Sequence, residues 1–247
     1  MSRSWIVAAT LAVLTVGHHT SPVAAKCARV MLVPQVLTHA GDTVPATGGV
    51  LVGYGETTDD LGDQYEGHDP ARNDDWVLAV GKRKLRPRIE QLAPGLAVYR
   101  PGAVRGARLA TLTLRDRKGK ALASLSLAPR GASAPLPAPA VTAVTSTSSK
   151  GFRGRLEQTV TAQLGGAIPA GAAALIAYEV DGATVTPLSW GRVAVGSTGA
   201  VVVYDTPGRC SGLPDGMTAP APGDTVVFAW VDQFGGLSPR SASIKVK

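Results

Sequence analysis

The chain has 247 residues, and its 25 lysines and arginines against 18 aspartates and glutamates give a formal net charge of +7. Its 29 glycines and 18 prolines exceed ordinary usage, and both residues are poor helix formers. The composition therefore excludes a mostly helical protein, while an apolar share of 45% argues against intrinsic disorder. We expect an all-β chain of short strands and tight turns.

Residues 1–25 have the pattern of a secretory signal peptide. A positively charged start precedes the apolar run Trp5–Val16, and small residues at 23–25 fit a cleavage site. The apolar run is too short to span a bilayer. A lipid anchor on Cys27 would need a small residue before it, where the chain has Lys26. We therefore expect a secreted or periplasmic protein with no membrane span.

Cys27 and Cys210 are the two cysteines of the chain. In an oxidising compartment, an even pair predicts one disulfide between them. Two unrelated buried thiols are the alternative. No Cys-x-x-Cys or Cys/His spacing predicts a metal site at either residue.

A segment rich in proline and alanine, residues 131–140, divides the exported chain into two similar halves. Such a composition is typical of a semi-rigid extended spacer. Each half has the length of a small β-sandwich. We predict a first domain over 26–130, a linker over 131–140 and a second domain over 141–247.

Short segments recur in the same order in both halves, which predicts a tandem duplication. The matching pairs are Leu51–Tyr54 with Leu175–Tyr178, Leu96–Tyr99 with Val201–Tyr204, and Asp116–Gly119 with Asp232–Gly235. The spacings between them differ, because the first half has an acidic insertion at 56–75 and the second has an insertion around Cys210. Loops on a rigid scaffold concentrate binding residues, so these insertions are the first places to look for a site.

The C-terminus carries a family resemblance. The alternating apolar strand Thr225–Val231 leads into Asp232-x-x-Gly235 and a last strand that ends at Val246. This pattern resembles the last two strands of bacterial immunoglobulin-like or fibronectin type III-like domains, although Gly236 stands where those usually have Asn. The resemblance implies two tandem antiparallel Ig-like β-sandwich domains after a cleaved signal peptide. It implies little about function, because this architecture hosts many roles.

The acidic insertion 56–75 holds 8 of the 18 acidic residues. Ca²⁺ takes six to eight oxygen ligands, and four side chains here are candidates to supply them: Asp59, Asp60, Asp63 and Glu66. The spacing is not that of an EF-hand. A solvated surface loop is the alternative.

A basic segment follows the acidic one. Lys82, Lys84, Arg86 and Arg88 share one face if this segment is a single strand, and that face would suit a polyanion such as an envelope polysaccharide. Aromatic residues are almost absent nearby, so specific nucleic-acid binding is poorly supported. A charged edge strand that resists aggregation is the alternative.

Enzyme motifs are missing from the sequence. It contains no Gly-x-Ser-x-Gly elbow, His-Glu-x-x-His pair or Walker loop. A hydrolase built on two distant carboxylates stays open as an alternative. Trp76 and Trp190 are candidate platforms for sugar rings, with burial in the core as the other reading.

These features together predict a non-enzymatic protein that binds or scaffolds envelope proteins or polysaccharides and needs no cofactor. A Ca²⁺-binding module and a carboxylate-based hydrolase are the alternatives. The sequence leaves the ligand and the oligomeric state open.

Overall fold

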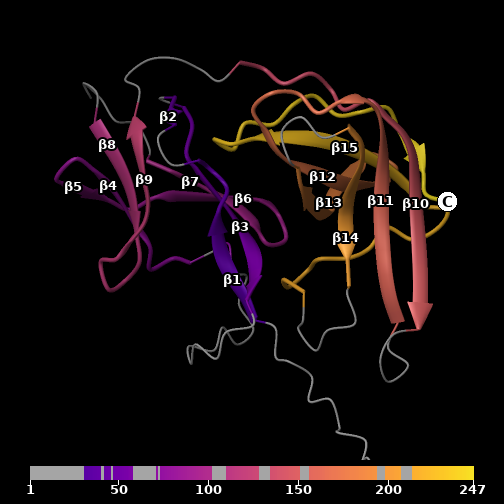
Figure 1. Ribbon diagram of the computed structural model, residues 1–247, viewed down its shortest axis with the longest axis horizontal. Helices are drawn as coiled ribbons and strands as arrows, with labels where there is room; N and C mark the ends of the chain where they lie inside the picture. The colour runs from indigo at the N-terminus through magenta and orange to yellow at the C-terminus, as the bar shows by residue number, and fades with distance from the viewer. Residues whose placement is uncertain are drawn as a thin grey trace, which may run out of the picture.

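The computed structural model describes residues 31–39, 42–45, 47–57, 71, 73–101, 110–127, 134–150, 156–193, 198–206 and 213–247. These residues form strands and turns, with no helix among them, so the all-β expectation is confirmed (Figure 1). The strands are β1 Met31–Val36, β2 Thr43–Val44, β3 Val50–Thr57, β4 Val77–Val80, β5 Arg83–Leu85, β6 Arg88–Ala93, β7 Leu96–Arg100, β8 Ala110–Arg115, β9 Ala121–Leu127, β10 Val141–Lys150, β11 Leu156–Ala167, β12 Ala172–Asp181, β13 Thr184–Arg192, β14 Thr198–Asp205, β15 Thr225–Asp232 and β16 Ile244–Lys245.

The N-terminal strands form two sheets, which we call the N-terminal sheet pair. One sheet has the order β1-β3-β7-β6, and the other has the order β2-β9-β8-β4-β5. Their strand pairs are antiparallel apart from β2 and β9, which run parallel. An apolar cluster fills the space between them, with Val52 of β3, Leu78 of β4, Tyr99 of β7 and Leu114 of β8 all fully buried.

The C-terminal strands form a second pair of sheets, the C-terminal sheet pair. Its orders are β10-β11-β14 and β13-β12-β15-β16, with antiparallel pairing throughout the described ladders. The period of two in β15 points Val226, Phe228 and Trp230 into the cluster between these sheets. The predicted strand Thr225–Val231 is thereby confirmed.

A third apolar cluster lies between the two sheet pairs. Leu51, Leu96 and Val98 contribute from β3 and β7, while β12 and β15 contribute residues such as Ile176 and Val231. These four strands are thus buried on both faces, which explains their nearly unbroken apolar sequences. Burying one such side chain stabilises a fold by about 1.5–3 kcal/mol, so the docked arrangement is strongly favoured. Figure 1 shows the two sheet pairs side by side.

The turn after β15 also joins the two sheet pairs, because its backbone carbonyls accept hydrogen bonds from the N-terminal pair. Thr38 Oγ1 donates to the Gln233 carbonyl at 2.6 Å, and the Arg100 guanidinium donates to the Gly235 carbonyl at 2.9 Å. The buried Asp232 holds the turn by accepting from the N–H groups of Phe234 and Gly236. The Asp232-x-x-Gly235 motif therefore closes a turn at the end of β15.

Two of the three predicted repeat matches occupy corresponding positions. Leu96–Tyr99 lies on β7, which pairs with β3, and Val201–Tyr204 lies on β14, which pairs with β11. The two Asp-x-x-Gly motifs both close turns after the strands β8 and β15. They share a glycine with positive φ, 84° at Gly119 and 82° at Gly235.

The match of Leu51–Tyr54 with Leu175–Tyr178 is wrong as a structural repeat. The first segment lies on β3, which pairs with β7, whereas the second lies on β12, which pairs with β13 and β15. The counterpart of β3 is β11, because β11 pairs with β14 as β3 pairs with β7. Both β3 and β12 are central strands buried on two faces, and this shared environment selects similar apolar residues.

The described part of the predicted linker, residues 134–140, contains neither helix nor strand. It is not fully solvated, because Leu136 packs against the C-terminal cluster and Pro139 is buried. The predicted signal peptide, residues 1–25, lies outside the described residues.

Candidate functional site

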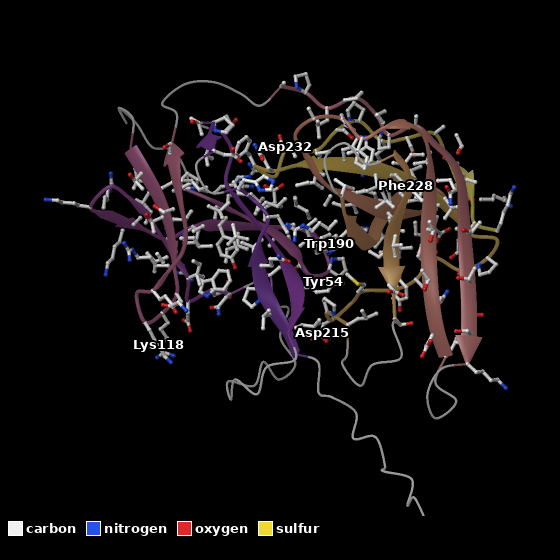
Figure 2. All side chains as sticks on the ribbon, viewed as in Figure 1. Tyr54, Lys118, Trp190, Asp215, Phe228 and Asp232 are labelled. Carbon is white, nitrogen blue, oxygen red and sulfur yellow. The ribbon has the colours of Figure 1, made fainter. Side chains whose placement is uncertain are left out.

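A small open pocket lies where β3 of the N-terminal sheet pair meets β13 and β14 of the C-terminal pair. Its volume is about 200 Å³, and its lining is Tyr54, Trp190, Gly191, Arg192, Val202, Tyr204 and Asp205. Figure 2 shows Tyr54 and Trp190 next to each other at this junction. The pocket exists only because the two sheet pairs are docked, since each contributes part of the wall.

Two aromatic side chains fix the inner wall of the pocket. The rings of Tyr54 and Trp190 meet edge to face, with centroids 5.3 Å apart and an interplanar angle of 77°. Trp190 Nε1 donates to the Pro94 carbonyl at 3.0 Å, and Tyr54 Oη donates to Met217 Sδ at 3.5 Å. Each of these bonds crosses between the sheet pairs, so the aromatic wall is held rigidly from both sides.

Polar and charged groups complete the pocket on β13 and β14. Arg192 and Asp205 are exposed on the rim, and Asp205 Oδ1 accepts from Thr159 Oγ1 at 2.8 Å. Burial, with smaller contributions from the nearby Tyr204 and Asp205, raises the pKa of Tyr54 to about 12. Burial also raises the pKa of Tyr204. Both phenols are therefore neutral at physiological pH, and the proton of Tyr54 is donated to Met217 Sδ.

The described lining of the pocket offers both apolar and polar contacts to a ligand, and its carboxylate is Asp205. Aromatic faces contact the apolar side of a ring. A guanidinium, a carboxylate and neutral phenols offer donors and acceptors for hydroxyl or carboxyl groups.

Both predicted insertions leave from strands that line the pocket. The acidic insertion follows Tyr54 at the end of β3, and the Cys210 segment follows Asp205 at the end of β14. The described end of the second insertion returns to the N-terminal pair, because Met217 contacts Tyr54 there. The insertions thus start from one region of the molecule, although their tips lie outside the described residues.

Several predicted site residues cannot be placed. The candidate Ca²⁺ ligands Asp59, Asp60, Asp63 and Glu66 lie outside the described residues, as do both partners of the predicted disulfide, Cys27 and Cys210. Within the described ranges, no three His, Cys, Asp or Glu side chains gather as a metal site would require.

The basic segment does not form one strand, which corrects the predicted shared face. Lys82 lies in a turn, Lys84 lies on β5, Arg86 lies between strands, and Arg88 begins β6 in the other sheet of the pair. Pro87 follows Arg86 and has no N–H for the ladder, so the strand stops there. All four basic side chains are exposed, and β5 is an edge strand.

The two candidate sugar platforms have different positions. Trp76 is buried in the N-terminal cluster, where its ring lies 5.3 Å from that of Tyr99. Trp190 is 6% exposed and borders the pocket. Four lining residues have no signal in the sequence that marks them as site residues: Tyr54, Arg192, Tyr204 and Asp205. The two tyrosines lie in the repeated segments, but nothing in the sequence indicates that they are close in space.

Comparison with known proteins adds no relative, since neither any protein-family model nor any curated protein matches the chain. In the described part of the chain, no helix has the length and hydropathy needed to cross a bilayer.

Proposed function

We propose that this is an exported, non-enzymatic binding protein that holds a single sugar unit of an envelope glycan in the pocket between two Ig-like β-sandwich modules. The strand orders support the Ig-like assignment. The C-terminal pair combines three strands with four, and the N-terminal pair adds a short parallel strand, β2, beside β9. Sandwiches of seven to nine strands in two antiparallel sheets are typical of immunoglobulin-like domains.

The observation that carries the proposal is the composition of the pocket. Tyr54, Trp190 and Tyr204 give it aromatic walls, while Arg192 and Asp205 offer a hydrogen-bond donor and an acceptor at its rim. A pyranose ring has one apolar face and several hydroxyls, so it matches such a wall and rim. The small volume, about 200 Å³, favours one ring over a longer segment.

The experiment is a titration of the mature protein with monosaccharides, comparing neutral hexoses with uronic acids. Trp190 supplies the readout, because its indole N–H is one signal in a nitrogen–proton NMR spectrum. We expect that signal to move on binding while the indole signal of the core residue Trp230 does not. Uronic acids should bind more tightly than hexoses, because Arg192 can pair with their carboxylate.

Two variants with a matched control test the residues. Arg192→Ala should weaken uronic acid binding about tenfold, since a hydrogen bond to a charged group contributes about 1.5–3 kcal/mol. Asp205→Asn should weaken hexose binding by a smaller factor. Arg240→Ala removes an equal charge from a side chain that lies over Tyr178 instead of the pocket, so it should leave both affinities unchanged. An unmoved Trp190 signal at saturating sugar would refute the proposal.

A further inference from the structure

The outer face of the β2-β9-β8-β4-β5 sheet is a second surface with a defined chemistry. In this sheet Leu78 and Leu114 pair across β4 and β8 and point into the N-terminal cluster. Successive residues of a strand face opposite sides, so the next row points outward. That row is Lys84, Ala79, Thr113 and Ser124, which are paired in sequence across β5, β4, β8 and β9.

Basic side chains border this outer face at both of its open sides. Lys84 is exposed on the edge strand β5. Arg115 lies two residues after Thr113 on β8, and Lys118 and Lys120 are exposed in the turn that follows. In Figure 2 Lys118 projects from the lower end of this sheet, well away from Trp190.

Two described carboxylates, Asp75 and Asp116, lie near this face. Asp116 Oδ1 accepts from the Lys120 N–H at 2.7 Å, and Asp75 lies 3.8 Å from the Arg117 guanidinium. That ion pair is highly exposed, so it contributes little stability and is weakened by salt. The positive field of the face is therefore only partly compensated by the described acidic groups.

The centre of the face is small and hydroxylated. Thr111, Ser124 and Ser126 are exposed there, whereas Ala79 and Thr113 are only 7% and 8% exposed, and Thr113 Oγ1 lies 3.5 Å from Ser124 Oγ. Short side chains leave a shallow surface along which an extended chain can lie close to the sheet. Neighbouring strands are about 4.8 Å apart and same-face residues about 6.6 Å apart along a strand, so the hydroxyls of β8 and β9, which are paired in register, are regularly spaced.

We propose that this face binds a linear anionic polysaccharide, with Lys84, Arg115 and Lys118 pairing to its acidic groups and the exposed hydroxyls of Thr111, Ser124 and Ser126 bonding to its sugars. The described face carries no exposed aromatic ring, on which binding of single-stranded nucleic acid usually depends. The large exposed apolar residues lie elsewhere, Leu156 on β11, Val202 on β14 and Leu237 between β15 and β16, so this face also lacks the anchors of a membrane surface.

The test measures binding of the mature protein to size-defined heparin fragments, with polygalacturonate as a carboxylate polymer and dextran as a neutral one. We expect both anionic polymers to bind, dextran to fail, and affinity to fall steeply with salt. Lys84→Glu with Lys118→Glu should weaken heparin binding about tenfold, since each lost contact weakens binding several-fold through its ion-release term. Lys84→Gln with Lys118→Gln, which removes both charges without reversing them, should lose less affinity for heparin.

The matched control reverses two exposed charges at the other end of the molecule, Lys245→Glu with Lys247→Glu. This control changes the net charge by the same amount as Lys84→Glu with Lys118→Glu. If its affinity for heparin falls less than about twofold, the effect of the first pair belongs to the local surface and not to the total charge. Equal losses in both double variants would overturn the proposal, as would dextran binding or tighter binding of single-stranded DNA than of heparin. The proposal does not depend on the junction pocket, because this face and the pocket share no residue.

Discussion

Gly53 of β3 lies directly against the indole ring of Trp190 of β13. A Cβ atom added at Gly53 would stand 2.5 Å from Cη2 of that ring, well inside van der Waals contact. The Trp190 ring cannot easily move away, because its indole N–H donates a hydrogen bond to the Pro94 carbonyl. The absence of a side chain at Gly53 is therefore what allows the two sheet pairs to approach and form the pocket.

Replacing Gly53 with alanine should destabilise the protein. Overpacking a close contact typically costs about 1–3 kcal/mol, and here the strain falls on the aromatic wall. Urea unfolding of Gly53→Ala should show this loss, and the sugar titration should show weaker binding. Gly166→Ala is the control, because a Cβ at Gly166 meets nothing within 4 Å. Equal stabilities of the two variants would contradict the close contact.

The same turn motif occurs in two environments, which allows a paired test. Asp232 is 6% exposed and its turn docks on the N-terminal sheet pair, whereas the turn of Asp116 extends into solvent. Asp232→Ala removes two charge-assisted bonds to partly buried N–H groups and should cost about 2–4 kcal/mol. Asp116→Ala should cost less than about 1 kcal/mol, because water replaces its bond. Chemical denaturation measures both, and similar losses would contradict a docking role for the Asp232 turn.

The strands were largely predictable from the sequence, because period-two patterns report local burial. Thr225–Val231 falls within β15, and in β8 the apolar Leu112 and Leu114 alternate with Thr111 and Thr113. The Asp-x-x-Gly turns were predictable as well, since a carboxylate acceptor and a glycine with positive φ are local requirements.

The docking of the sheet pairs was not predictable, although one sign of it was present. Val227, Ala229 and Val231 make the second face of β15 apolar, and that face proves to be the junction. The sequence alone does not say which surface covers an apolar face. The pocket depends on that choice, so Tyr54 and Tyr204, which lie far apart in the chain, were found only in the structure.

The raised pKa of Tyr54 predicts a loss of stability at high pH. The unfolded side chain ionises near its ordinary value of 10.0, whereas the folded one ionises near 12. Between these values the unfolded state loses its proton first, so this contribution is complete below about pH 10 and is lost as the pH rises to about 12. The free energy of unfolding should therefore fall less over this interval in Tyr54→Phe than in the native protein. Identical pH dependence in both would contradict the burial of the phenol.

The disulfide between Cys27 and Cys210 stays a prediction, and the strand arrangement suggests how to test it. Cys27 precedes β1, which begins opposite Thr57 of β3, and Cys210 follows β14, whose Asp205 shares a pocket with Tyr54 of β3. Mass spectrometry without reductant should find both cysteines in one linked peptide pair. Reduction should then lower the melting temperature, because a long closed loop contributes up to about 5 kcal/mol. Alkylation of both thiols without reductant would show that the bond is absent.

The apolar junction predicts that the two sheet pairs unfold together. Modules with small polar interfaces move and unfold separately, but here Leu51, Val98, Ile176 and Val231 are fully buried between the pairs. Calorimetry should therefore show one transition. Val98→Asp puts an unpaired charge into the junction while leaving both inner clusters intact, so it should lower stability by several kcal/mol and split the transition in two. Leu156→Asp, at a side chain that is 66% exposed, should change neither feature, and two transitions in the native protein would contradict the prediction.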